Sequence, residues 1–157
     1  MPSVRGLIGA SVVCAAIAAG SSAPADSAFP LCTGTQVRSL VTQHIAAFNA
    51  GDRAKLERLW ERDRFQWYST QAPGERFSEE AKRRSTLMRY FADRHTQHER
   101  LRLRSFRFNG NSNSYGHFEY RLWRSADELA TPQAVLGKGA ATCGTAGRIA
   151  VWSMGLE

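Results

Sequence analysis

The chain has 157 residues, which is enough for one domain with a single hydrophobic core and too short for two such domains. Its formal net charge is +7, and arginine supplies most of the basic side chains. These arginines are dispersed, and residues 29–157 contain no nucleic-acid-binding motif, internal repeat or low-complexity tract. A nucleic-acid partner is therefore not expected, and a compositional preference for arginine accounts for the charge.

The N-terminal segment differs in composition from the rest of the chain. Arg5 and the terminal amine precede an uncharged apolar run of roughly 13 residues, positions 7–19, whereas a membrane-spanning helix needs roughly 20. Small residues follow, with cleavage candidates at Ala16-Ile17-Ala18 and within residues 23–28. This pattern predicts a signal peptide and leader over residues 1–28, no stable membrane span, and a secreted or periplasmic domain. An uncleaved anchor is the alternative.

Cleavage of that leader decides the cysteine count. Cys14 lies inside the apolar run and would be removed, which leaves Cys32 and Cys143. An even number of cysteines in an exported domain predicts one disulfide. It would close a loop of about 110 residues and contribute about 4–5 kcal/mol. The alternative is a pair of buried thiols.

Two helices are predicted in the first half of the exported domain. Thr35 is a suitable N-cap for a helix that ends near residue 50, where Asn49 or Gly51 supplies the stop. Asp52 is a good N-cap for a second, short helix. Both helices carry apolar stripes at three- and four-residue spacing, and His44 falls on the first stripe as a packed histidine. The stripes are Val37, Leu40, Val41, Ile45 and Phe48, followed by Leu56, Leu59 and Trp60.

An aromatic strand separates these helices from a third. Residues 65–70 alternate, which predicts a strand with Phe65 and Trp67 on one face. A turn is expected at residues 71–74. The third helix is predicted over residues 78–98, acidic at its start and arginine-rich later. Its buried positions are Leu87, Met88, Phe91 and His95.

The rest of the chain is predicted to be β-structure. Residues 99–108 and 113–124 form a hairpin with a two-residue turn at Gly110-Asn111. Strands at residues 135–143 and 148–154 complete the sheet. The turn sets a register with apolar pairs on the inner face and mixed pairs on the outer face. The inner pairs are Leu101 with Tyr120 and Leu103 with Phe118; the outer pairs are Arg102 with Glu119, Arg104 with His117, and Phe106 with Tyr115.

Helices followed by mainly antiparallel strands predict an α+β fold, with three N-terminal helices packed on a curved, mostly antiparallel sheet. The stretch from residue 37 to residue 67 resembles the nuclear-transport-factor-2-like superfamily, which includes ketosteroid isomerase and SnoaL-type polyketide cyclases. The resemblance rests on Ala46-Ala47-Phe48-Asn49-Ala50-Gly51-Asp52, on Leu56 and Leu59, and on Phe65-Gln66-Trp67. It implies that residues 29–157 form a cone with an apolar cavity, often dimeric through the sheet.

Three further segments are similar to a subgroup of exported bacterial proteins without an assigned activity. They are Tyr90-Phe91-Ala92-Asp93-Arg94-His95, Gly137-Lys138-Gly139-Ala140 and Val151-Trp152-Ser153-Met154. Isomerase-type members of the superfamily place a base carboxylate and oxyanion donors inside the cone. No Asp or Glu of this chain matches that base, so the resemblance carries over no catalytic residue and no cofactor.

The candidate ligand-binding residues lie on the predicted inner surface. They are Phe65, Trp67, His95, Phe118 and Tyr120. The same set could form an ordinary core. Tyr120 is the most informative member, because a buried phenol needs a hydrogen-bond partner. His95 and His98 do not predict a metal site, because no third ligand is identifiable.

Glu119 is a carboxylate in the middle of a predicted strand. It could act as a general base beside His117 and Arg121, or form an outer-face ion pair with Arg102, which the register favours. The outer face mixes arginines with aromatic side chains, a composition typical of protein interfaces. We therefore expect a homodimer contact there; arginines that cover exposed rings are the alternative.

These observations predict an exported domain that binds an apolar small molecule between helices and sheet, or a protein through the sheet face, without identifiable catalysis. One alternative is a lyase or isomerase acting on a hydrophobic substrate, with Tyr120 and His95 handling protons. Another is an accessory structural domain with no ligand. An enzyme requires two titratable groups that converge on one cavity, whereas a binder requires the cavity without them.

Overall fold

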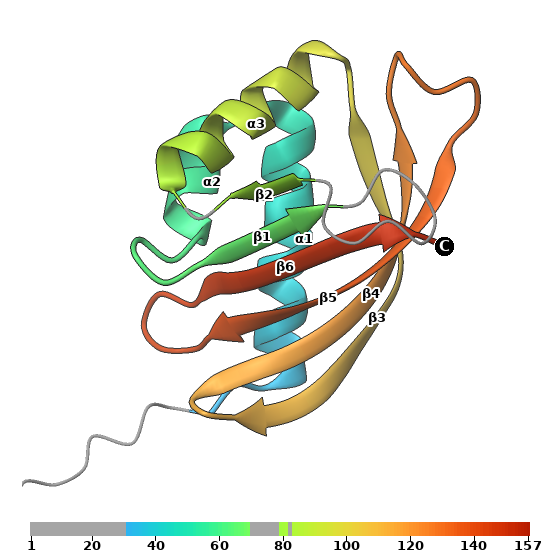
Figure 1. Ribbon diagram of the computed structural model, residues 1–157. Coiled ribbons are helices and arrows are strands. Elements are labelled where there is room, and N and C mark those ends of the chain that lie inside the picture. The colour runs from blue at the N-terminus through green and yellow to red at the C-terminus, as the bar shows by residue number, and fades with distance from the viewer. Residues whose placement is uncertain (1–30, 70–78, 82) are drawn as a thin grey trace, which may run out of the picture.

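The computed structural model describes residues 31–69, 79–81 and 83–157. The predicted signal peptide and leader, and the turn expected at residues 71–74, lie outside this part of the chain. The described residues form the predicted α+β fold, in which three helices lie against one face of a six-stranded sheet (Figure 1). The core lies between these two layers.

Helix α1 (Gly34–Ala50) and helix α2 (Arg53–Leu59) follow the predicted pattern closely. The N-cap of α1 is Thr33 instead of Thr35, because Thr33 and Gln36 satisfy each other's backbone N–H groups in a capping box. Gly51 ends α1 in the left-handed conformation, with φ +67°. Asp52 Oδ1 then accepts a hydrogen bond of 2.9 Å from the Lys55 N–H and begins α2, as predicted.

The third helix is shorter than predicted. Helix α3 spans Arg84–Thr96, whereas Glu79–Ala81 form a short strand, β2. Strand β2 pairs antiparallel with β1 (Gln66–Ser69), with Ala81 opposite Trp67. The acidic residues that indicated a helix start therefore lie on an edge strand. Pairing with β1 outweighed their local helix preference.

The sheet contains four long strands besides β1 and β2. They are β3 (Arg100–Ser112), β4 (Tyr115–Ser125), β5 (Gln133–Thr142) and β6 (Arg148–Leu156). The strand order is β2-β1-β6-β5-β4-β3. Only the β1–β6 pair among these is parallel, so the sheet is mixed and mostly antiparallel. Figure 1 shows the long strands curving around α1, which crosses behind the sheet.

The predicted hairpin register is wrong. The β3–β4 turn lies at Asn113 and Ser114, both at positive φ, instead of at Gly110-Asn111. Two register shifts interrupt the pairing, between Leu103 and Ser105 and again near Gly110. Each shift adds one residue to β3, and such bulges break the strict alternation on which the prediction depended.

The first register shift changes which side chains of β3 face the core. Leu101 and Leu103 face inward before it, and Phe106 and Phe108 face inward after it. Phe106, predicted on the outer face, therefore packs on Phe118 with 6.0 Å between ring centroids. Strand β4 keeps its alternation here, so the prediction that it turns Phe118 and Tyr120 to the core is confirmed.

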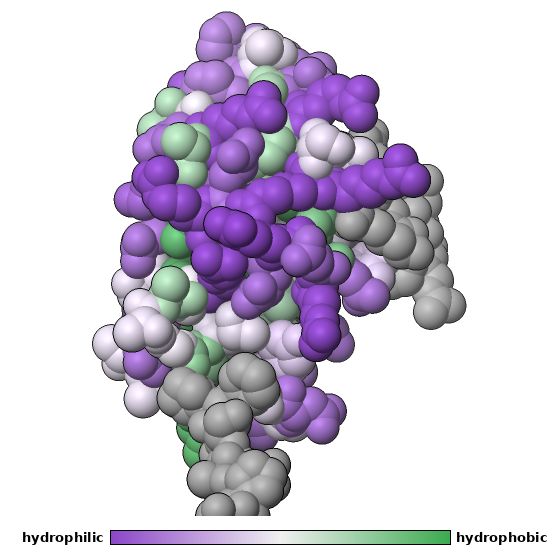
Figure 2. Space-filling model, turned by 90° about the vertical axis from the view of Figure 1, so that its left-hand side faces the viewer, coloured by the Kyte–Doolittle hydropathy of each residue, from purple (hydrophilic) through white to green (hydrophobic). Residues whose placement is uncertain are grey.

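One end of the molecule is strongly hydrophilic. It lies at the left of Figure 1, at α2 and the starts of α3 and β6. Residues of these three elements line a common hollow. Figure 2 views this end directly and shows long hydrophilic side chains gathered in its middle.

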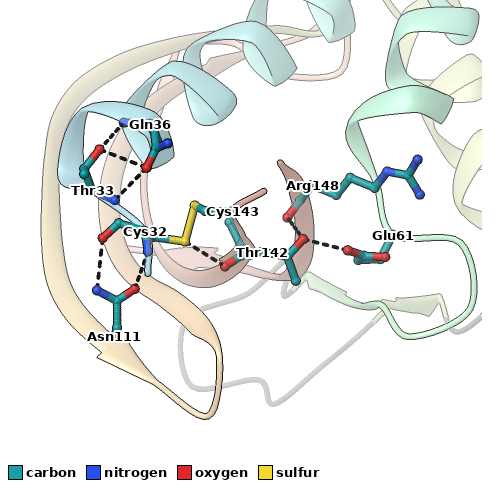
Figure 3. Close-up of a disulfide and its surroundings, with 9 residues drawn as sticks. Cys32, Thr33, Gln36, Glu61, Asn111, Thr142, Cys143 and Arg148 are labelled. Carbon is teal, nitrogen blue, oxygen red and sulfur yellow. Dashed lines mark hydrogen bonds between the residues drawn. A yellow bond between two sulfur atoms is a disulfide. The ribbon is translucent and has the colours of Figure 1, made fainter. Parts of the chain in front are cut away.

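The predicted disulfide between Cys32 and Cys143 is confirmed, with 5.1 Å between the two Cα atoms. It ties the segment before α1 to the residue that follows β5 (Figure 3). Asn111 holds the same segment, because its side chain accepts from the Cys32 N–H at 2.9 Å and donates to the Cys32 carbonyl at 3.0 Å. Disulfides are typical of proteins that fold in oxidising compartments. Among the described residues, no helix is long and apolar enough to cross a membrane.

Candidate functional site

The side chains predicted to line a ligand site are packed against one another and their neighbours. Phe118 and Tyr120 lie side by side on β4, and both contact Trp152 of β6, at centroid distances of 6.0 Å and 4.3 Å. Trp67 is opposite Trp152 in the β1–β6 pairing and packs on Tyr90 at 4.2 Å. These side chains are brought together as an aromatic layer on the inner face.

The other two predicted ligand-binding residues, Phe65 and His95, lie outside this aromatic layer. Phe65 meets Trp60 edge-to-face at 5.8 Å, near the end of α2. His95 lies on α3 against the α1–α2 turn, where a Cβ atom on Gly51 would be 2.6 Å from its Nε2 atom. Its Nδ1 atom is buried without a hydrogen-bond partner among the described residues. His95 and Tyr120, paired in the predicted enzyme alternative, therefore have different surroundings.

Glycines of β5 make room for the rings of β4. A Cβ atom on Gly139 would lie 2.3 Å from Cζ of Phe118, and one on Gly137 would lie 2.4 Å from the Tyr120 hydroxyl. Side chains at these two positions would occupy the space that the rings fill. The glycines flanking Lys138 thus serve close packing inside a strand.

The hydroxyl of Tyr120 has a partner within the protein. It donates a hydrogen bond of 2.6 Å to the backbone carbonyl of Ser153 on β6. Burial raises the pKa of Tyr120 well above its ordinary value, so the phenol stays protonated at neutral pH. Its single proton is therefore already engaged.

His44 lies at the centre of the aromatic core. The Trp60 indole N–H donates to His44 Nδ1 at 3.3 Å, and the rings of Phe91 and Trp152 lie 5.5 Å and 4.7 Å away. Because Nδ1 accepts, the neutral ring carries its proton on Nε2. Burial lowers the pKa of His44 to about 3. The prediction that His44 is a packed histidine is confirmed, although the sequence did not identify Trp152 as its neighbour.

A buried ionic network was not predicted. Glu99, between α3 and β3, is only 1% exposed and lies between two arginines. Arg94 Nε donates to its Oε2 atom, and Arg124 Nη2 donates to the same oxygen at 3.0 Å. Arg124 Nε also lies 3.0 Å from Oε1, at an angle that does not make a hydrogen bond. Glu128 adds a second carboxylate to both arginines. No local pattern signals this network, because Arg124 is far away in sequence.

Glu119 forms an ion pair on the outer face, as the sequence predicted, but its partner is Arg107 and not Arg102. Its Oε2 atom accepts from Arg107 Nη2 at 2.6 Å, because the shifted register places Arg107 opposite it instead of Arg102. The hydrogen bond from Arg107 lowers the pKa of Glu119. The carboxylate is therefore a poor proton acceptor at neutral pH.

The outer face of the sheet contains a hollow of about 500 Å³, which we call the outer hollow. Leu136 lines this hollow and is 42% exposed, more than the other leucines of the sheet. Arg104 stacks on Trp123, with its Cζ atom 4.5 Å from the ring centroid. The side chains and backbone that line the outer hollow include Phe106, Arg107, Glu119, Arg121, Leu136 and Lys138.

Burial holds two titratable groups of the core, Tyr120 and His44, in their uncharged forms. Tyr120 and His44 both contact Trp152, and at neutral pH both are uncharged with a polar atom already bonded. Within residues 31–69, 79–81 and 83–157, no group of three His, Cys, Asp or Glu side chains could hold a metal ion.

No family model and no curated protein sequence matches this chain. Solved structures do match, over most of its length. A proposed dehydratase of the nuclear-transport-factor-2-like family from Streptomyces avermitilis superposes with a TM-score of 0.63 at 13% identity, over 79% of this chain and 95% of that one. An uncharacterised protein with a cystatin-like fold from Caulobacter vibrioides gives 0.64 at 10% identity, over 79% and 89%.

A third similar structure is a subunit of an oxygenase. The beta subunit of a benzoate 1,2-dioxygenase from Burkholderia mallei gives a TM-score of 0.62 at 7% identity, over 78% of this chain and 89% of that one. At such low identities the similarity concerns the fold alone. The same scaffold is present in proteins of quite different description.

Proposed function

Because the chain has the nuclear-transport-factor-2-like fold, which does not by itself define an activity, we propose that it is a non-catalytic binding domain whose partner docks on the outer face of the sheet. The observation that carries this proposal is the contrast between the two faces. The inner face is filled by mutually packed rings, whereas the outer face has a hollow with an exposed leucine and several cations.

The chemistry of the outer hollow favours a partner of a particular kind. Arg107, Arg121 and Lys138 surround Leu136, and the ion pairs to Glu119 and Glu157 do not balance all the basic groups of this face. Arginine and aromatic side chains are enriched at protein interfaces, where they contribute much of the binding energy. We infer a protein partner that presents carboxylates around an apolar side chain.

A homodimer through the same face is the second candidate. Leu136 favours it, because a two-fold axis near this residue would bury the exposed leucine against its own copy. The same symmetry would bring Arg107, Arg121 and Lys138 of two chains together, and like charges weaken such a contact. An acidic partner avoids this repulsion.

A small apolar ligand between helices and sheet is a further proposal. It would contact Phe65, Trp67, His95, Phe118 and Tyr120, and the rings would have to separate to admit it. The disulfide supports export of the domain to an oxidising compartment, where any of these partners would be met.

Photocrosslinking in the cell that makes the protein tests the docking proposal. A photoreactive phenylalanine analogue replaces Leu136 in one variant and Ala46, exposed on α1, in a matched control. We expect position 136 to crosslink to a different protein with an acidic surface, and the crosslink to disappear when Arg107 and Arg121 are changed to glutamate. Position 46 should give no such product.

The other outcomes contradict the proposal in distinguishable ways. A crosslink between two copies at position 136 would establish the homodimer instead. If position 136 gives no product and native mass spectrometry of the purified chain finds a retained small molecule, the binding site lies inside the cone.

A further inference from the structure

Four arginines converge at the hydrophilic end of the molecule, away from the outer face of the sheet. They line a hollow of about 600 Å³, which we call the arginine hollow. One side chain comes from α2, one from the segment after it, one from the first residue of α3 and one from the first residue of β6. They are Arg58, Arg62, Arg84 and Arg148.

These guanidinium groups have no carboxylate within ion-pair distance among the described residues. Glu57, which also lines the hollow, pairs with Arg53 at 3.1 Å. Glu61 accepts a hydrogen bond of 2.6 Å from Thr142 Oγ1. In Figure 3 the group bonded to the Glu61 carboxylate is the Thr142 hydroxyl and not the Arg148 guanidinium. Arginines without a bonded carboxylate around a hollow create a positive local potential.

The local charge balance remains positive when every lining group is counted. Glu57 and Asp63 are the carboxylates of the arginine hollow, against four arginines. Arg84 begins α3, whose N-cap residue makes no side-chain cap bond, so the positive end of that helix adds to the same potential. Figure 2 shows the long hydrophilic side chains of this end reaching over its surface.

We propose that the arginine hollow binds an anion that carries two or more phosphate or sulfate groups. Arginine matches such groups well, because its planar fork donates two parallel hydrogen bonds to a pair of oxygens. The volume of about 600 Å³ falls within the range of ligand sites and exceeds what a single oxyanion fills. Four guanidinium groups from separate elements can then divide between at least two oxyanion groups.

Isothermal titration calorimetry of the full chain with inorganic tripolyphosphate tests this site. An ionic strength of about 0.01 M keeps charge interactions strong, because the Debye length there is about 30 Å. We expect one tripolyphosphate per chain and a dissociation constant at least about tenfold lower than that of orthophosphate, which can engage fewer of the arginines. In the double variant Arg58→Gln/Arg148→Gln, the dissociation constant for tripolyphosphate should rise by about tenfold or more.

A matched control separates a built site from general attraction to a basic protein. Arg38→Gln/Arg89→Gln removes the same charge from exposed positions outside the hollow and should change the dissociation constant less than about twofold. Asp63→Asn removes a repulsive carboxylate from the hollow and should tighten binding.

Three results would overturn the proposal. Equal weakening by the two double variants would mean that net charge alone attracts the anion. Equal affinity for orthophosphate and tripolyphosphate would mean a site for one oxyanion. No measurable heat at millimolar tripolyphosphate would mean no site. A dextran sulfate chain that binds several copies, with the same sensitivity to Arg58→Gln/Arg148→Gln, would identify the source as a polymer instead of a free anion.

Discussion

Asn49, at the end of α1, makes two hydrogen bonds with the backbone of Leu101 at the start of β3. Its side-chain amide donates to the Leu101 carbonyl and its side-chain oxygen accepts from the Leu101 N–H, both at 2.8 Å. Strand β3 is an edge of the sheet, so this side chain satisfies backbone groups that have no neighbouring strand. Asn49 therefore joins the first helix to the sheet and has a structural role.

Replacing Asn49 by alanine should lower the free energy of unfolding by about 1–3 kcal/mol, because a partly buried N–H and carbonyl of Leu101 lose their partners. Urea denaturation measures this change. Gln43→Ala removes an exposed hydrogen bond to Ser39 and should cost less than about 0.5 kcal/mol. Equal effects of the two substitutions would show that the Asn49 bonds contribute nothing specific.

Glu99 should be the most sensitive carboxylate for stability. Glu99→Gln removes the buried one of the two carboxylates that Arg94 and Arg124 share and leaves them only the more exposed Glu128; loss of a buried ion-pair partner typically costs about 3–5 kcal/mol. Glu119→Gln breaks an ion pair on the exposed outer face and should give a much smaller change. Denaturant midpoints of the two variants provide the comparison. A Glu99→Gln protein as stable as the original chain would mean that water screens the network.

His44 should make the protein less stable at acidic pH. Its pKa is about 3 in the folded protein and about 6.5 when unfolded, so between these values the unfolded chain binds a proton that the folded chain does not. Stability is therefore full above pH 6.5 and falls as the pH decreases. The loss attributable to His44 between pH 7.5 and pH 5 should be about 2 kcal/mol.

The control for this pH dependence is His44→Phe, which removes the titrating group and keeps a ring in the core. Denaturant titrations of both proteins at several pH values should show a shallower dependence in the variant over the same window. Parallel curves for the two proteins would exclude His44 as the source, whatever the variant's absolute stability.

The sequence predicted the parts of the fold that local chemistry controls. The stop at Gly51, the cap at Asp52 and the inward direction of Phe118 and Tyr120 depend on residues close together in the chain. The disulfide was also predictable, because only two cysteines follow the leader. Each of these features depends on one helix end, one strand or one chemical pair.

The parts that were missed depend on contacts between distant segments. The bulges in β3 are set by how that strand follows the curved sheet, and no residue near Arg104 signals them. Strand β2 exists because β1 offers a free edge. The pairing of Glu99 with Arg124 and the arginine hollow likewise join elements whose proximity only the complete fold determines.

The packing of the inner face is tested by filling a glycine. Gly139→Ala would bring a methyl group within 2.3 Å of Cζ of Phe118 and 2.5 Å of the Val151 carbonyl, so the strands or the ring must move. We expect a loss of about 1–3 kcal/mol in the free energy of unfolding, measured by denaturant titration. Gly34→Ala is the control, because its nearest neighbour, Cβ of Phe108, is 3.3 Å away.

A second substitution identifies the cause of that loss. Phe118→Leu shortens the ring side chain, so combining it with Gly139→Ala should cost less than the sum of the two single changes, because the methyl group gains room. Strict additivity would instead assign the loss to the backbone contact with Val151. If Gly139→Ala alone left the stability unchanged, the rings would not fill the inner face tightly, and an apolar ligand between helices and sheet would become the better of the proposed functions.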